Sequence, residues 1–186
     1  AMRILLSLAV DNQQAEVIRR WFSDRDTRDR VLGQEIISRF FDRTHGYAQI
    51  ESDLHSLGVK LLGTVLPSTT QSADILFTTK SGRKYLGEHL LDGKVMSKDT
   101  VVDMELRPQV PAYPPAIQAL AEAEIVILAC GSPFGSVLCN FLPVGMRGAM
   151  ESSAAQVFLV TNLVSTRNET DKFSPQDYVE LVKKYS

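Results

Sequence analysis

Two short apolar runs constrain the fold of this chain more than any other feature. Residues 125–128 and 156–161 have the length and composition of strands that are buried on both faces of a sheet. A loop containing glycine and serine follows the first run, and a helical pattern then continues to about Met150. Strand, helix and strand in this order predict a βαβ unit with parallel strands and a right-handed crossover. The chain is therefore predicted to be an α/β protein with a parallel βαβ core.

The first third of the chain is predicted to be helical. Its apolar residues recur at the spacing of one helix face, and glycines stand where helices would end. Four segments show this pattern: 4–8, 15–22, 36–41 and 47–57.

The hydrophobic period changes at residue 59. Residues 59–66 are apolar and rich in β-branched side chains, which predicts a strand that ends at Pro67. Residues 73–79 and 84–86 flank Ser81-Gly82, a pair typical of a hairpin turn. Residues 100–106 alternate between apolar and polar side chains. Together these segments predict a small antiparallel or mixed β region.

Prolines mark the starts of two further helices. Pro115 is placed to open a helix that runs through Ala123. Near the end of the chain, Ser174, Pro175 and Asp177 have the spacing of a capping box, which predicts a final helix.

Length and charge exclude several classes of function. The 186 residues show no linker, so we expect a single domain over 1–186. A net charge of −2 offers no basic surface for nucleic acid. No apolar run reaches the roughly 20 residues needed to cross a bilayer, so no membrane partner is expected. Only two cysteines occur, Cys130 and Cys139, which is typical of a reduced, cytoplasmic protein.

The loop after the first apolar run is a candidate binding site, because open α/β sheets bind ligands at the carboxyl ends of their parallel strands. This loop contains Gly131, Ser132, Gly135 and Ser136. Glycine lets backbone N–H groups approach a phosphate, serine adds hydroxyl donors, and a following helix adds positive charge. The spacing fits neither a Walker loop nor a dinucleotide-binding fingerprint. A phosphate-binding loop and a plain strand-to-helix turn therefore both stay open.

The loop after the second apolar run carries Asn162, Arg167, Glu169 and Thr170. A carboxylate and an arginine beside a phosphate site would orient a polar substrate. An exposed loop with its charges in solvent is the simpler alternative.

The sequence gives little support for a metal site, a serine hydrolase or a catalytic cysteine. The three histidines have no metal-ligand spacing and no cysteine or carboxylate cluster beside them, so no protein metal site is expected. No Gly-x-Ser-x-Gly elbow indicates a serine hydrolase. Cys130 is either a nucleophile at a helix start or a small buried thiol, and we expect the second.

Three stretches of the chain together resemble one known family. Residues 125–140 are similar to its apolar strand, Gly-Pro-Gly-Ser loop and Pro-Asn helix start, and residues 162–173 to its Asn-x-x-Thr-x-x-Gly-Glu-Thr stretch. The segment 63–67, followed by Gln71-Ser72 and Gly87-Glu88, is similar to its β region. On these segments the chain resembles the CofD-like family, which contains 2-phospho-L-lactate transferase and the YvcK-like proteins.

The resemblance implies a Rossmann-like, three-layer α/β domain with a nucleotide at the strand ends. It implies that five residues of the first loop and helix start bind the nucleotide and its phosphates: Gly131, Ser132, Gly135, Ser136 and Asn140. It also implies that three residues of the second loop orient the substrate: Asn162, Glu169 and Thr170.

The two branches of this family imply different activities. In the first, 2-phospho-L-lactate passes from a guanylyl carrier to a deazaflavin acceptor, so the chain would be a transferase of phosphorus-containing groups that uses Mg²⁺ and no bound organic cofactor. In the alternative, the chain would be a YvcK-like regulatory protein of cell-wall and morphology control that binds nucleotide sugars without catalysis. We expect the first activity, in an impaired or altered form.

We expect an impaired or altered activity because the sequence departs from the family pattern at several places. The family's Gly-Gly-Gly-Thr-Gly loop and Asp-Asp-Gly-Gly segment do not occur in this sequence. Ala129-Cys130 replaces Gly-Pro, Asn168 replaces a glycine and Tyr178 replaces a histidine. Added Cβ atoms would limit close backbone approach to a ligand. A second alternative is a remnant that binds nothing; an uncovered sheet edge would in any case favour a homo-oligomer.

Overall fold

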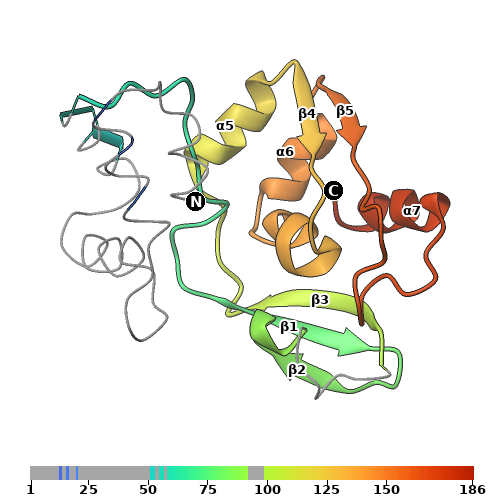
Figure 1. The fold of residues 1–186 in the computed structure, drawn as a ribbon. Helices are drawn as coiled ribbons and strands as arrows, with labels where there is room; N and C mark the ends of the chain where they lie inside the picture. Colours follow the sequence, from blue (N-terminus) through green and yellow to red (C-terminus); the bar gives the residue numbers. More distant parts are fainter. Residues whose placement is uncertain are drawn as a thin grey trace. The chain divides into compact units, whose positions relative to one another are not determined.

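The computed structural model describes residues 58–91 and 99–186, together with seven residues further upstream: Gln13, Glu16, Arg20, Glu51, Ser52, His55 and Ser56. The chain forms two compact units, residues 1–67 and 68–186. The four helices predicted over 4–57 lie outside the described residues, apart from those seven, which are helical. Both candidate loops belong to the second unit, which Figure 1 colours from green to red.

In the first unit, the prediction of a strand over 59–66 is wrong. Leu61 makes an isolated bridge, and the other residues of this stretch are irregular. The amide N–H of Val65 donates to Oε1 of Glu51 at 3.0 Å, and the hydroxyl of Thr64 donates to the same oxygen. A side-chain carboxylate thus satisfies a backbone donor that a strand would pair with its neighbour.

The second unit begins with an antiparallel sheet whose strand order is β2-β1-β3. Its strands are β1 (Asp74–Thr79), β2 (Lys84–Leu86) and β3 (Val101–Arg107). Gly82 has a φ of 82°, a left-handed conformation that suits glycine in the β1–β2 turn. The predicted hairpin and the strand predicted over 100–106 are both confirmed.

The two apolar runs form a parallel pair, β4 (Ile125–Leu128) and β5 (Gln156–Leu159), as predicted. Their burial differs from the prediction. One face of the pair contributes Leu128 to the core, whereas Ile125 and Ile127 on the other face are 56% and 63% exposed. The two strands pair only with each other among the described residues, whose fold is mixed α/β with two small sheets.

The crossover between β4 and β5 is not the single helix that was predicted. It consists of a π-helical turn, η3 (Pro133–Val137), a 3₁₀ turn, η4 (Leu138–Phe141), and a short helix, α6 (Met146–Ser152). Pro143 lacks a backbone N–H and Gly145 has a φ of 102°, so the chain cannot continue helically between η4 and α6. The helical spacing of Phe134, Leu138 and Phe141 still buries all three on one side.

Two regular helices complete the unit (Figure 1). α5 (Pro114–Glu122) begins with proline, close to the predicted start. α7 (Pro175–Tyr185) has the predicted capping box, in which Ser174 and Asp177 exchange side-chain and backbone hydrogen bonds. No helix among the described residues is long and apolar enough to cross a membrane.

The last turn of α7 is tied to β3 through buried polar contacts. The Tyr185 hydroxyl donates to Oδ1 of Asp103 at 2.8 Å and accepts from the Met104 amide at 3.1 Å. Phe77 of β1, Leu128 of β4 and Tyr185 of α7 belong to one hydrophobic cluster. A single core therefore joins both sheets and supports the two strand-end loops.

Candidate functional site

The loops that follow β4 and β5 lie together, and the side chain of Asn162 joins them as a neighbouring strand would. Its Oδ1 accepts from the Gly131 amide at 2.9 Å, and its Nδ2 donates to the Gly131 carbonyl at 2.8 Å. Nδ2 also donates to Oγ1 of Thr166 at 3.0 Å. The carboxamide therefore sets the backbone conformation at Gly131 and has both of its Nδ2 donors engaged within the protein.

Glu169 makes a second connection between the loops, in a dry environment. Its residue is 1% exposed. One carboxylate oxygen accepts from the Ser132 hydroxyl at 2.6 Å, and the other accepts from the Phe134 amide at 2.8 Å. Hydrogen bonds to an ionised carboxylate are shorter and stronger than those between neutral groups. Glu169 thus lies against the donors that the sequence suggested for a phosphate.

Ser132 also accepts hydrogen bonds from the turn that follows it. Its hydroxyl oxygen accepts from the Gly135 amide at 3.0 Å, and its carbonyl accepts from the Ser136 amide at 2.9 Å. A five-residue turn such as η3 has only a small dipole, so the positive helix end expected from the sequence contributes little here.

The residues beside Glu169 hold its loop from the other side. Asn168 and Thr170 are buried, and Asn168 has a φ of 65°. The Asn168 amide group donates to the carbonyl of Leu91 at 2.8 Å, while Oγ1 of Thr170 accepts from the Tyr178 hydroxyl at 3.1 Å. The left-handed backbone explains why glycine or asparagine suits position 168, and the buried amide adds a contact that glycine lacks.

The two glycines of the first loop differ in how much space an added Cβ would find. A Cβ on Gly135 would lie 2.8 Å from Oγ of Ser132 and 2.9 Å from Cδ1 of Leu91, closer than atoms pack in proteins. A Cβ on Gly131 would meet Ser136 and Val137 at ordinary distances of 3.4 and 3.5 Å. Packing therefore requires glycine at 135, whereas it does not at 131.

The outer side of the first loop is accessible. Cys130, Ser136 and Asn140 are exposed. Nδ2 of Asn140 donates to the carbonyls of Ser136 and Val137 at 2.8 and 3.1 Å, which leaves its Oδ1 toward solvent. In the described part of the chain, the Ser132 amide and the Ser136 hydroxyl have no hydrogen-bond partner. These two donors, the first on a partly buried residue and the second on an exposed one, are the groups of the candidate site left for a ligand.

The two thiols occupy opposite environments, and the expectation of a buried Cys130 is wrong. Cys130 is exposed, whereas Cys139 is partly buried and its Sγ donates to the Gly135 carbonyl at 3.1 Å. Burial raises the pKa of the Cys139 thiol to about 11, and the charges of Glu88 and Glu169 raise it further. Cys139 is therefore a packing residue at neutral pH.

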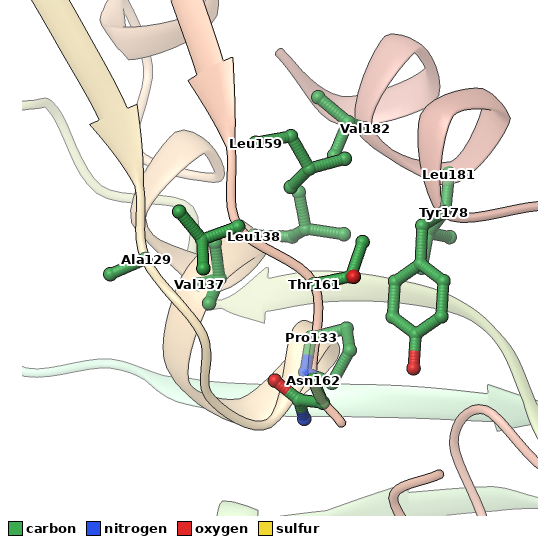
Figure 2. A pocket seen from close by; sticks show the side chains of 11 residues that line it. Ala129, Pro133, Val137, Leu138, Leu159, Thr161, Asn162, Tyr178, Leu181 and Val182 are labelled. Atoms are coloured by element: carbon green, nitrogen blue, oxygen red, sulfur yellow. The ribbon is translucent and has the colours of Figure 1, made fainter. Parts of the chain in front are cut away.

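A small pocket lies behind the loops, between the strand ends and α7 (Figure 2). Its volume is about 20 Å³, and its polar lining comes from Thr161, Asn162 and Tyr178. A space of this size suits about one water molecule, whereas small-molecule sites measure roughly 300–1,000 Å³. A nucleotide therefore does not fit this pocket.

No three His, Cys, Asp or Glu side chains gather to hold a metal ion within the described residues. Of the carboxylates in or near the loops, Glu169 accepts hydrogen bonds from the first loop, Asp171 accepts from the Asn168 amide, and Glu88 is exposed. No step of a reaction is therefore assigned to a protein-bound Mg²⁺ here.

Geometry and fold together define an α/β protein with two interlocked loops at the carboxyl ends of a parallel strand pair. This chain belongs to the CofD family: the family model described as 2-phospho-L-lactate transferase CofD matches residues 2–186.

Two bacterial proteins and one solved structure illustrate what the chain is similar to. A Listeria innocua protein named gluconeogenesis factor is 26% identical over 98% of this chain and 56% of its own length. An Aquifex aeolicus protein whose name also refers to gluconeogenesis is 31% identical over 69% of this chain and 39% of its own. A crystal structure of a UPF0052-family protein from Bacillus halodurans superposes with a TM-score of 0.85 at 21% identity, over 98% of this chain and 58% of that one. The chain thus spans about half the length of the relatives it matches.

The sequence led to these loops but not to the division of labour within them. It singled out Asn162, Glu169 and Thr170 as substrate-orienting, whereas the structure directs their described hydrogen bonds into the protein. The contacts of Asn168 with Leu91 and of Tyr178 with Thr170 were missed. The glycine that the family has at position 168 was the one available signal, because it indicates a left-handed backbone there.

Proposed function

We propose that this chain is part of a YvcK-like, gluconeogenesis-factor type of regulatory protein that binds a nucleotide sugar and performs no chemistry. The ligand would lie on the outer side of the first loop, where its phosphates meet the Ser132 amide and the Ser136 hydroxyl and a hydroxyl of its sugar donates to Oδ1 of Asn140. The names of the bacterial relatives support this branch of the family over the transferase branch.

One observation carries the proposal: the polar side chains that a transferase would use on its substrate are hydrogen-bonded within the protein. Ser132 bonds to Glu169, and Asn162 bonds to Gly131. Polar groups that are hydrogen-bonded to one another within the protein hold a loop in one shape, and those bonds compete with contacts to a substrate. The arrangement supports recognition of a ligand by a rigid loop.

The loop also supplies suitable chemistry for a diphosphate. Backbone N–H and hydroxyl donors on a fixed turn bind anions without a large basic surface, in keeping with the net charge of −2. Ala129 and Cys130, which stand where the family has Gly-Pro, lie on the exposed side of the same loop. They would contact the sugar or the base by shape, because neither side chain offers strong hydrogen bonds.

The test is thermal unfolding of the chain with UDP-N-acetylglucosamine, UDP, GDP and GTP, each with and without Mg²⁺. A ligand at 100 times its Kd stabilises by about 2.7 kcal/mol, which shifts Tm by roughly 2–4 °C for a chain of this size. We expect a shift with the nucleotide sugar that is larger than with UDP. The proposal would be contradicted if the Tm with each of the four ligands equalled the Tm of the chain without ligand.

The transferase is the second candidate, because the matching family model carries that description. It predicts a shift selective for guanine nucleotides and strengthened by Mg²⁺, since the metal would arrive with the phosphates. The same panel therefore separates the two branches.

Self-association stays a prediction. The exposed face of β4 and β5, with Ile125, Ile127 and Phe158 at 46–63% exposure, is the surface that would favour it. Light scattering at several concentrations measures the mass, and a monomer at every concentration would exclude a homo-oligomer. A homo-oligomer whose Tm changes with none of the four nucleotides would indicate the second alternative, a remnant that binds nothing.

A further inference from the structure

We propose that Glu169 is a positioning residue whose carboxylate acts as a built-in anion for the first loop. It fills the innermost donors of the loop and so holds the outer donors in the shape that a ligand meets. In its ligand part this inference rests on the proposed function, but the role of Glu169 itself is testable without any ligand.

The innermost donors of the loop are the ones that a phosphate would otherwise take. The Ser132 hydroxyl and the Phe134 amide both point at Glu169, at 2.6 and 2.8 Å. Glu169 is 1% exposed, so no external anion shares these donors while its side chain stays in place. The carboxylate comes from the second loop, which makes the shape of the first loop depend on the second.

A continuous set of contacts leads from this carboxylate to the outer side of the loop. Ser132 bonds to Glu169 through its hydroxyl and receives the Ser136 amide on its carbonyl at 2.9 Å. The carbonyl of Ser136 in turn accepts from Asn140 at 2.8 Å. Movement of Ser132 would therefore displace both Ser136 and Asn140.

The two cysteines give a direct measurement of this role. Cys139 is tied to the Gly135 carbonyl inside the turn, and Cys130 is exposed at its edge. A thiol reagent should therefore label Cys130 first and the partly buried Cys139 more slowly, at a rate that rises when the turn opens. The experiment compares the labelling rate of Cys139 in the wild type and in Glu169→Gln, which keeps the size of the side chain.

Glu88→Gln is the matched control for charge. Glu88 is exposed and also raises the pKa of Cys139, so its replacement removes a charge near the thiol without removing a contact to the loop. We expect Glu169→Gln to label Cys139 at least about tenfold faster than Glu88→Gln, the factor that corresponds to losing one charge-assisted hydrogen bond. Equal rates in the two variants would overturn the inference.

Tyr185→Phe is the control for general loss of stability, because it loosens α7 from β3 and leaves the loop contacts intact. If Cys139 labels equally fast in Tyr185→Phe and in Glu169→Gln at temperatures equally far below each Tm, global opening explains the result and the inference is wrong.

A second variant tests the anion directly. Glu169→Ala leaves the Ser132 hydroxyl and the Phe134 amide facing an empty space, which formate can enter. Formate should slow Cys139 labelling in Glu169→Ala and not in the wild type, relative to chloride at equal ionic strength. An equal response to both salts would count against a built-in anion; if this variant fails to fold, Glu169→Gln decides alone.

The ligand arm separates this inference from the proposed function. Where the wild type binds the nucleotide sugar, Glu169→Gln should bind it about tenfold more weakly and Glu88→Gln should bind it as the wild type does. Unchanged affinity in Glu169→Gln would overturn the ligand part. If the wild type binds no nucleotide, the proposed function fails, and Cys139 labelling still decides whether Glu169 positions the loop.

Discussion

Two carboxylates organise loops of the second unit with similar hydrogen bonds but in different surroundings. Asp99 accepts from the Ser81 hydroxyl and from the Ser81 and Thr100 amides where β3 meets the hairpin turn. Glu169 accepts from one hydroxyl and one amide as well, but in a place that water does not reach. Removing an exposed acceptor lets water replace it, whereas removing a buried acceptor leaves its donors unsatisfied. Similar hydrogen bonds should therefore contribute little to stability at the exposed Asp99 and much more at the buried Glu169.

The largest effect is expected from removing the buried carboxylate. Glu169→Ala should lower the free energy of unfolding by about 3 kcal/mol, because a buried amide and a partly buried hydroxyl lose their acceptor and a cavity remains. Urea unfolding measures the difference, with Asp99→Ala as the matched variant at the accessible carboxylate. A loss as large in Asp99→Ala would break the comparison.

A smaller effect is expected from crowding the first loop, against which Glu169 lies, while leaving the carboxylate in place. Gly135→Ala should cost about 2 kcal/mol, because its Cβ would press on Ser132 and Leu91. Gly131→Ala should change stability by less than about 0.5 kcal/mol, since its Cβ finds ordinary contacts. If Gly131→Ala nevertheless weakens nucleotide binding, the ligand approaches the backbone at 131; equal stability losses in the two variants would contradict the packing argument.

Asp103 is the intermediate case, because its side chain is partly accessible but its partner Tyr185 is buried. Tyr185→Phe should cost about 1–2 kcal/mol, since the Met104 amide loses its acceptor. Partial burial would raise the pKa of Asp103, but hydrogen bonds from Lys184 and Tyr185 outweigh it and hold the pKa below its usual value. Thermal unfolding at pH 7 measures the effect; no change in Tm would mean that water reaches the Met104 amide.

The smallest effect belongs to Asp99 and depends on pH. Hydrogen bonds from Ser81, followed by Thr79, lower the pKa of Asp99 from 3.8 to about 2. A native pKa below the unfolded one stabilises the fold above about pH 4, and this contribution is lost as the pH falls toward 2. The Tm difference between wild type and Asp99→Asn should therefore be small at pH 7 and shrink below pH 4. A difference that stays constant from pH 7 to pH 3 would argue against this ionised contact.

Sequence reasoning succeeded where a local signal specifies the structure. The Ser81-Gly82 turn, the proline start of α5, the capping box at Ser174 and the two apolar runs were all predicted correctly, because each depends on a few adjacent residues. It failed where a distant group intervenes. Glu51 takes the amide of Val65, and Pro143 with Gly145 divides the crossover although the apolar spacing is helical.

For the candidate site, the sequence indicated the two loops and the residues in them, since loop composition and the βαβ order are readable along the chain. It did not indicate which donors face a ligand. Ser132 and Ser136 are both serines beside a glycine, yet one hydroxyl is held by Glu169 and the other is exposed. Gly131 and Gly135 differ in the same way, one free of packing constraints and one enclosed by Ser132 and Leu91.

The sequence by itself determined the order of elements, their local caps and turns, and the membership in the CofD family, because these depend on residue type and spacing along the chain. Only the tertiary structure decided that Glu169 lies against the first loop, that Cys139 is the less exposed of the two thiols, and that one face of the parallel pair is exposed. Burial and the pairing of polar groups depend on segments far apart in sequence, and the free energy of a hydrogen bond depends on whether water can replace it.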